Sequence, residues 1–414
     1  MRIVRIENGF SRGPQSADVA QSVAEILDVV AARGDAAVLD FTERFDRAEL
    51  GPEQLSVDSN ELEASIGVLE PAVLDGLRTA IHNVRAVART QLSEPAAVEL
   101  PEGHRVEITE VPVRRAAIYV PGGEAPYPST VVMGAITART AGVDEIVVCA
   151  PPGPGGRAHP VILAACVLCE VQEVYRMGGA QAIGALAYGT ESVRRVDVIV
   201  GPGNPYVQEA KRQVAWTHVG IDGIAGPSEL AILAAGEGIE PELVALDLLA
   251  QSEHGRSSPL WVLSADDELL NAVTEAVERL EPERPSAGDA ELQVISARSL
   301  GDALTIAEAI APEHLELVGD EAEALADRVR FAGCLFVGSG AATAFGDYVA
   351  GSNHVLPTGG AARFQSALSP ATFRRRMARV SLPGEAPARL APAGADLARA
   401  EAFPVHAESM ERRA

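Results

Sequence analysis

The 414-residue sequence has only four cysteines, no cluster of basic residues and no long apolar segment. Four cysteines in apolar surroundings are too few for a disulfide framework. Without an uninterrupted apolar run of roughly 20 residues, no membrane-spanning helix is expected. The N-terminal segment MRIVRIENGF also lacks the apolar core and cleavage site of a secretory signal. We therefore expect a soluble globular protein in the cytoplasm.

Positive charge is scarce. Lysine and arginine number 34 against 58 aspartates and glutamates, which gives a formal net charge of −24. The basic residues are scattered along the chain, so most of the surface should repel a phosphate backbone. Binding to nucleic acid is therefore not expected.

One cysteine pair has the spacing of a zinc knuckle. Cys166 and Cys169 lie in the apolar segment ILAACVLCEV, and no second CxxC pair occurs elsewhere. Two residues three positions apart on a helix share one face, so this pair is better explained by burial in a core.

The first quarter of the chain is predicted to be mainly helical. From about residue 17 to 92, apolar residues recur at spacings of three and four, which is typical of amphipathic helices. The segment from about 98 to 115 alternates polar and apolar residues, which predicts an antiparallel strand pair. A chain of this length is also too long for one compact core, so two or more domains are expected.

The middle of the chain alternates short apolar strands with helices. This order predicts a parallel, doubly wound sheet, in which ligands bind at the carboxyl ends of the strands. Glycine-rich turns at 119–123, 178–181 and 201–204 follow three of these strands. Each alone could be an ordinary tight turn, and none is the GxGxxG fingerprint. Three such turns at one edge of a sheet favour a dinucleotide cofactor, because each can bring backbone N–H groups close to a pyrophosphate. The four predicted strands are 116–120, 145–150, 173–177 and 197–201.

A second α/β alternation runs from residue 229 to about 352, and a polar extension begins near 370. We therefore predict an α/β protein with two Rossmann-like doubly wound domains and a cleft between them, plus N-terminal helices and a C-terminal helical tail. Residues 1–115 and 229–369 would form the first, split domain, with the N-terminal helices. Residues 116–228 would form the second domain, and residues 370–414 the tail.

Four short segments place histidines beside carboxylates or amides, and they are 251–254, 313–314, 347–354 and 401–406. Histidine, aspartate and an amide together form a ligand set that suits Zn(II) or a neighbouring divalent ion. A histidine beside a glutamate also offers a proton acceptor near neutral pH. Taken singly, His314 could be a buried structural histidine, His254 a surface residue and Asp347 a turn residue. Their joint occurrence favours a site over these alternatives.

Eight segments, in order, resemble the signature blocks of the histidinol dehydrogenase family, and the resemblance extends from about residue 15 to the end. They are YVPGGEAPYPSTVVM, GGAQAIGALAYGT, VDVIVGPGNPYVQEAKR, VGIDGIAGPSE, LLAQSEHG, APEHLE, FGDYVAGSNHVLPT and EAFPVHAES. The resemblance implies a homodimeric enzyme that oxidises L-histidinol twice with NAD⁺, through the aldehyde, to L-histidine. It also implies one Zn²⁺ per subunit.

The resemblance implies roles for individual residues. Glu313 and His314 would be the acid–base pair. The zinc ligands would be Gln251, His254, Asp347 and His406. Cofactor contacts would be Tyr119, Gln181 and Asn204. Substrate contacts would be Ser228, His354 and Glu401, together with the zinc ligands and His314. Glu401 and His406 would act in the partner subunit's site.

One departure from the family pattern concerns the substrate. Glu401-Ala-Phe replaces the usual Glu-Gly-Leu beside a substrate contact, and the added methyl group could reshape the pocket. A zinc- and NAD-dependent dehydrogenase for another small polar alcohol is therefore the alternative function. A zinc hydrolase or a non-catalytic metal-binding module would leave the glycine turns or the Glu313–His314 pair without a role. No acidic ribose-binding residue stands out at a diagnostic spacing, so the preference between NAD⁺ and NADP⁺ stays open.

Overall fold

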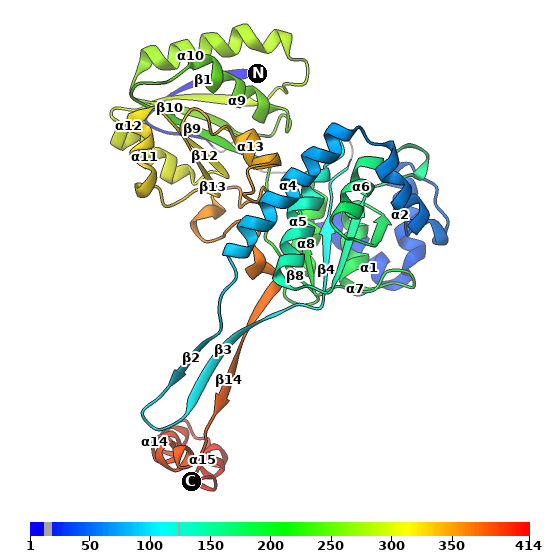
Figure 1. Cartoon of the computed structure of the whole chain (residues 1–414), viewed down its shortest axis with the longest axis vertical. Coiled ribbons are helices and arrows are strands. Elements are labelled where there is room, and N and C mark those ends of the chain that lie inside the picture. Colours follow the sequence, from blue (N-terminus) through cyan, green and yellow to red (C-terminus); the bar gives the residue numbers. More distant parts are fainter. Residues whose placement is uncertain (12–18, 123–124) are drawn as a thin grey trace.

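A computed structural model describes residues 1–11, 19–122 and 125–414. Gly123, the last residue of the first glycine turn, and residues 17–18 at the start of the predicted helical segment lie outside the described residues. Figure 1 shows two parallel sheets flanked by helices, and a narrow antiparallel arm that projects away from both. The α/β fold with two doubly wound sheets is thus confirmed. In the part of the chain that the model describes, no helix has both the length and the apolar character needed to cross a bilayer.

The six-stranded sheet has the order β1-β11-β10-β9-β12-β13, and all its pairs are parallel. Its central strands are buried on both faces, as expected for a parallel sheet covered by helices. Its strands are β1 (Arg2–Glu7), β9 (Leu230–Ala234), β10 (Leu260–Ser264), β11 (Glu291–Ser296), β12 (His314–Val318) and β13 (Cys334–Val337). Its helices are α9 (Pro241–Ser252), α10 (Asp267–Leu280), α11 (Leu300–Ile310), α12 (Asp320–Glu323) and α13 (Thr343–Tyr348).

The five-stranded sheet has the order β6-β5-β4-β7-β8 and is also parallel. Successive residues of its central strand point to opposite faces, so Ile118 joins one apolar cluster and Tyr119 the other. Its strands are β4 (Arg115–Tyr119), β5 (Glu145–Ala150), β6 (Glu173–Arg176), β7 (Val198–Val200) and β8 (Gly220–Ile221). The helices that connect them are α5 (Pro128–Ala141), α6 (Pro160–Leu168), α7 (Gly179–Tyr188) and α8 (Pro205–Val214).

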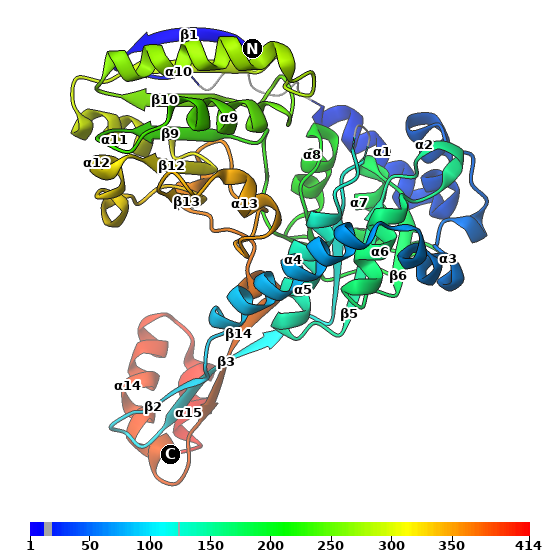
Figure 2. The same cartoon turned by 45° about the horizontal axis from the view of Figure 1, so that its top comes forward.

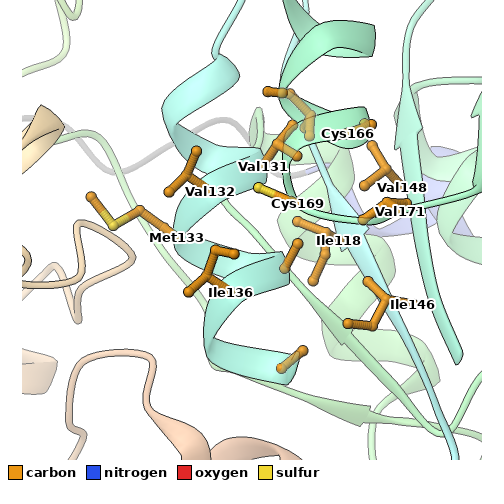
Figure 3. Packing of buried hydrophobic residues seen from close by; sticks show 14 of the residues in the cluster. Ile118, Val131, Val132, Met133, Ile136, Ile146, Val148, Cys166, Cys169 and Val171 are labelled. Carbon is orange, nitrogen blue, oxygen red and sulfur yellow. The ribbon is translucent and has the colours of Figure 1, made fainter. Parts of the chain in front are cut away.

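The cysteine pair on and after α6 lies in this core. Cys166 and Cys169 are both buried among apolar side chains of α5 and β4 (Figure 3). Burial raises the pKa of both thiols well above the ordinary range, so they stay protonated. The prediction that this CxxC pair packs in a core is confirmed.

The N-terminal helices pack on the five-stranded sheet, whereas the predicted split domain placed them with the six-stranded sheet. Only β1 joins the six-stranded sheet. Apolar residues of α1, such as Leu27, contact α7 and α8, while those of α4, such as Ile81, belong to the cluster around α5 and α6. Helical periodicity identifies the apolar face of a helix, but it does not reveal which sheet will cover that face. The boundaries at 115, 229 and 369 therefore stay predictions. The helices are α1 (Ala20–Arg33), α2 (Asp35–Asp46), α3 (Ser59–Ala64) and α4 (Pro71–Thr90).

The antiparallel arm contains the predicted strand pair, β2 (Ala96–Glu99) and β3 (Arg105–Pro112). A third strand, β14 (Arg374–Ser381), pairs with β3 along its whole length, so this part of the predicted helical tail 370–414 is a strand. Cross-strand ion pairs, including Arg376 with Glu110, accompany the pairing. The helices α14 (Ala386–Ala400) and α15 (Pro404–Glu411) lie at the far end of the arm (Figure 2).

Candidate active site

The predicted acid–base pair lies at the amino edge of the six-stranded sheet. His314 is the first residue of β12, and it is in register with Leu230, the first residue of β9. Glu313 therefore lies beside Ser228 and Glu229, which precede β9. Parallel pairing brings these two segments together although about 85 residues separate them in sequence.

Hydrogen bonds hold both side chains of the pair. The Ser228 hydroxyl and the Glu229 amide donate to Oε2 of Glu313 at 2.7 and 2.9 Å. Nδ1 of His314 lies 2.9 Å from the Glu229 carbonyl oxygen. A carbonyl only accepts, so Nδ1 carries the proton and Nε2 is left as the basic nitrogen. The site thus contains an oriented, unprotonated nitrogen.

Burial shifts the pKa of both groups. Loss of solvent raises the pKa of Glu313 to about 8, and the hydrogen bonds from Ser228 and Glu229 partly oppose this shift. Burial also lowers the pKa of His314, although the Asp347 carboxylate counteracts it. At neutral pH the imidazole is therefore uncharged, and Glu313 gains its full charge only in mildly alkaline solution.

Three of the predicted metal ligands surround this pair. The side-chain amide of Gln251, near the end of α9, donates to Ser228 at 2.7 Å, so its carbonyl oxygen is the atom left to bind a ligand. Asp347 on α13 lies 3.8 Å from Nε2 of His314. Loss of solvent lowers the pKa of His254, and the Asp347 carboxylate is close enough to counteract this shift.

These donors fit zinc in their chemistry. An amide oxygen, an imidazole nitrogen and a carboxylate oxygen form a borderline ligand set. Among the residues that the model describes, no three His, Cys, Asp or Glu side chains form a metal cluster. The predicted set differs from such a cluster because it includes a glutamine and needs a fourth ligand from elsewhere.

Two further predicted substrate contacts lie in the same region. Ser228 connects Glu313 with Gln251. His354 has Nδ1 2.9 Å from the Asp347 carbonyl and Nε2 3.2 Å from the Thr130 hydroxyl on α5. Since α5 covers the other sheet, the site lies where elements of the two sheets meet.

The remaining two predicted site residues are far away within the same chain. Glu401 directly follows α14, and His406 lies on α15, and both helices are at the tip of the arm in Figure 1. Both are exposed, and the His406 ring lies against the neighbouring Phe403 ring, with 5.3 Å between centroids. One chain alone does not bring these residues to Glu313 and His314.

The predicted cofactor contacts line a separate large cavity of about 1490 Å³. Tyr119, Gln181 and Asn204 lie at the carboxyl edge of the five-stranded sheet. The Tyr119 hydroxyl accepts from the Gly179 amide at 3.1 Å. The side-chain nitrogen of Gln181 is buried and has no partner among the described residues, so it could donate to a bound molecule.

Sequence reasoning missed the opposite wall of this cavity. Residues of α1, of α2 and of the position after α2 line it, and among them are Arg33, Arg44 and Arg47. Their guanidinium groups suit the phosphates of a dinucleotide. No motif marks these arginines, because α1 and α2 reach the cavity only through their packing on the five-stranded sheet.

A buried ion pair holds the turn that carries Asn204. Lys211 on α8 donates to the Gly201 carbonyl at 2.9 Å and pairs with Asp222. Asp222 in turn accepts from the Gly201 amide at 2.7 Å. Gly201 has a φ of +121°, and a Cβ atom there would lie 2.1 Å from the Tyr119 carbonyl oxygen. The ion pair therefore maintains a backbone that only glycine can adopt.

Lys211→Met is expected to lower the free energy of unfolding by roughly 3–5 kcal/mol, because Asp222 would remain buried without its cation. Chemical denaturation followed by circular dichroism measures this loss. The neighbouring variant Arg212→Met is the matched control. Arg212 pairs with Glu209 at the surface, and its loss should cost less than about 1 kcal/mol. Equal losses in the two variants would contradict a role for the buried pair.

The chain has clear relatives of known family. Residues 11–414 match the family model described as histidinol dehydrogenase. The histidinol dehydrogenase of Gluconobacter oxydans is 42% identical over 409 residues, which cover 97% of this chain and 94% of that protein. That of Cereibacter sphaeroides is 45% identical over 404 residues, covering 96% and 92%. The crystal structure of histidinol dehydrogenase from Elizabethkingia anophelis superposes with a TM-score of 0.93 at 30% identity, covering 100% of this chain and 98% of that one.

Proposed function

The chain belongs to the histidinol dehydrogenase family, and we propose that it oxidises L-histidinol through the aldehyde to L-histidine with two NAD⁺. The observation that carries this proposal is the buried Glu313–His314 pair, with Gln251 and Asp347 beside it. A proton acceptor and a set of metal donors in one place are what a two-step oxidation of an amino alcohol requires.

His314 is the proposed base of the first oxidation. An alcohol has a pKa near ~16, so its hydroxyl proton must pass to a base as hydride leaves the carbon. Nε2 of His314 is unprotonated, because Nδ1 donates to the Glu229 carbonyl. The same bond orients the ring, so no reorganisation is needed when the proton arrives.

Glu313 is the proposed base of the water that enters the second oxidation. The aldehyde must first become a gem-diol, since hydride loss from the deprotonated gem-diol gives the acid directly, whereas hydride loss from the free aldehyde would leave an unstable acylium ion. Glu313 in its carboxylate form takes a proton from the attacking water, while His314 returns the proton of the first step to the carbonyl oxygen. His314 is then free to accept a proton of the gem-diol as the second hydride leaves. Ser228 and the Glu229 amide fix one carboxyl oxygen, which leaves the other for water.

The cofactors are also part of the proposal. Zinc held by Gln251, His254, Asp347 and His406 of the partner subunit would supply orientation of the substrate's imidazole and amino groups. Tyr119, Gln181 and Asn204 would bind NAD⁺, which would accept the hydride. Because Glu401 and His406 lie at the tip of the arm, we propose a homodimer in which each tail completes the other subunit's site.

The stoichiometry of the reaction tests the proposed function. Purified protein with added zinc and limiting L-histidinol should form two NADH for each substrate molecule, with L-histidine as product. No turnover of histidinol, together with NADH formed from another small polar alcohol, would favour the alternative dehydrogenase. Hydrolysis of an amide or ester without NADH from any alcohol would contradict both.

The pH dependence of aldehyde oxidation should follow Glu313. Burial raises its pKa to about 8, and only its carboxylate form can accept a proton from water. The rate of aldehyde oxidation should therefore rise as pH increases through about 8, and fall tenfold per pH unit well below it. This can be measured with the aldehyde as substrate between pH 6 and 9.5. In Glu313→Gln the residual rate should lose this dependence, and an unchanged profile would contradict the assignment.

A further inference from the structure

Three polar residues lie directly behind the site and have no role in the mechanism above. Asp247 precedes Gln251 by one turn of α9, and Thr343 precedes Asp347 by one turn of α13. Glu316 follows His314 by two residues, so both side chains project from the same face of β12. The elements α9, β12 and α13, which supply Gln251, His314 and Asp347, thus each supply one member of this second group as well.

Glu316 caps the helix that carries Asp347. Its Oε1 accepts hydrogen bonds from the Thr343 amide at 2.8 Å and from the Thr343 hydroxyl at 2.7 Å. Thr343 is the first residue of α13, and the preceding Ala342 has no side chain that could cap it. A side-chain oxygen at this position satisfies amides that a helix start leaves free. Glu316 therefore attaches α13 to β12.

The second oxygen of Glu316 faces α9. Oε2 is buried and has no hydrogen-bond partner among the described residues, and Asp247 on α9 lines the same small pocket as Glu316, close enough for each carboxyl group to act on the pKa of the other. Two carboxyl groups can bond only if one of them is protonated. Burial raises the pKa of both carboxyl groups, so the pair retains a proton that they can share in one hydrogen bond. The bond attaches α9 to β12.

Packing alone does not account for this arrangement. Glu316 is buried, and a leucine of similar size would fill its position without the cost of desolvating a carboxyl group. What the carboxyl group adds is a pair of directed bonds, one to each of the helices that hold the metal donors.

We propose that Glu316 is a positioning residue that bridges α9 and α13, and thereby sets the separation of Gln251 and Asp347 on which metal affinity depends. This inference rests on the proposed metal site. It concerns the support of the ligands, since Glu316 itself touches neither substrate nor reacting atoms. Groups that orient metal ligands typically contribute 10- to 100-fold in affinity.

The test compares two variants of Glu316 in the full-length enzyme. Glu316→Leu removes both bonds, whereas Glu316→Gln keeps an oxygen for Thr343 and a donor for Asp247. The dissociation constant for Zn²⁺, measured by competition with a chromophoric chelator, should rise about 10- to 100-fold in Glu316→Leu. In Glu316→Gln the dissociation constant should stay within about threefold of wild type. If the negative charge of Glu316 were required instead of its hydrogen bonds, this variant would also lose affinity.

A matched control separates positioning from stability. Gln293 on β11 is also buried and hydrogen-bonded, to Ser11 and Trp261, but two strands separate β11 from β12. Gln293→Leu should lower the melting temperature of the metal-free protein without changing zinc affinity. If Glu316→Leu behaves in the same way, or if Glu316→Gln loses as much affinity as Glu316→Leu, the positioning role is wrong.

Two more variants keep the test decisive. Should Glu316→Leu fail to fold, Thr343→Val removes one bond at nearly constant volume and should weaken zinc binding about threefold to tenfold. Unchanged affinity in this variant would overturn the proposal.

His254→Ala tests the metal site itself. If it binds zinc as wild type does, the proposed ligand set fails. If it loses zinc while the Glu316 and Thr343 variants do not, only the positioning role fails.

Discussion

His314→Asn is expected to slow both oxidation steps by roughly 100- to 10,000-fold, the range typical of lost acid–base catalysis. Asparagine can still donate to the Glu229 carbonyl, so the side chain should keep its place. It has no basic nitrogen where Nε2 of His314 was, and neither the alcohol nor the gem-diol would then have its proton acceptor. NADH formation measured separately with histidinol and with the aldehyde gives the two rates.

Glu313→Gln is the companion variant that separates the two steps. The amide oxygen can still accept from Ser228 and Glu229, but the side chain can no longer deprotonate water. Alcohol oxidation should change little, while aldehyde oxidation should slow by a factor within the same range. His82→Asn, at an exposed position on α4, should match wild type in both steps. Equal losses in both steps for Glu313→Gln would refute this division of labour.

Removal of the tail before residue 395 is expected to abolish both zinc retention and turnover. The truncation deletes Glu401 and His406 but leaves both parallel sheets and the strands of the arm intact. A metal site that loses one of four protein ligands binds its ion far more weakly. Metal content after dialysis and the rate of NADH formation measure the two losses. A truncated protein with full activity would exclude the tail from the site.

Mixing two inactive variants tests whether the tail acts in the partner subunit. A hybrid dimer of His314→Asn and His406→Ala chains has one site with both changes and one with neither, if the tails cross over. Random reassembly should then recover about a quarter of the wild-type activity, as two-fold symmetry requires. If each tail serves its own chain, every site carries a change and the mixture stays inactive.

Exposed apolar residues on the tail are in keeping with such an exchange. Leu397, Phe403 and Val405 are all more than half exposed in the single chain, at 67%, 52% and 72%. They lie on or between α14 and α15, whose shared core consists of little more than three alanines. A helical pair this small is expected to gain stability by packing on another surface.

Periodicity predicted the secondary structure well but not its assembly. The alternation of strands and helices after residue 115 gave both parallel sheets, because buried parallel strands are short apolar runs that periodicity detects. The N-terminal helices were assigned to the wrong neighbour, since Leu27 and Ile81 mark apolar faces without specifying the sheet they cover. The strand β14 was missed because its four arginines resemble a polar extension until three of them pair with Glu107 and Glu110.

The position of the candidate site, like the fold, could be predicted from the sequence only in part. The carboxyl-end rule for parallel sheets agrees with the position of the cavity beside Tyr119 and Gln181. His314 lies instead at the amino edge of the other sheet, where β12 begins beside β9. Residues without a motif, such as Arg44 at the cavity and Glu316 behind the site, could not be found from the sequence, because their roles depend on contacts across distant segments.

The sequence by itself determined the chemistry available to this protein: which side chains can accept protons or bind a metal, which segments form strands or helices, and to which family the chain belongs. The tertiary structure alone decided which of these groups meet, that Glu313 and His314 are buried enough to shift their pKa values, and that Glu401 and His406 lie beyond reach in one chain. Side-chain chemistry is local, whereas distance and desolvation depend on how remote segments pack.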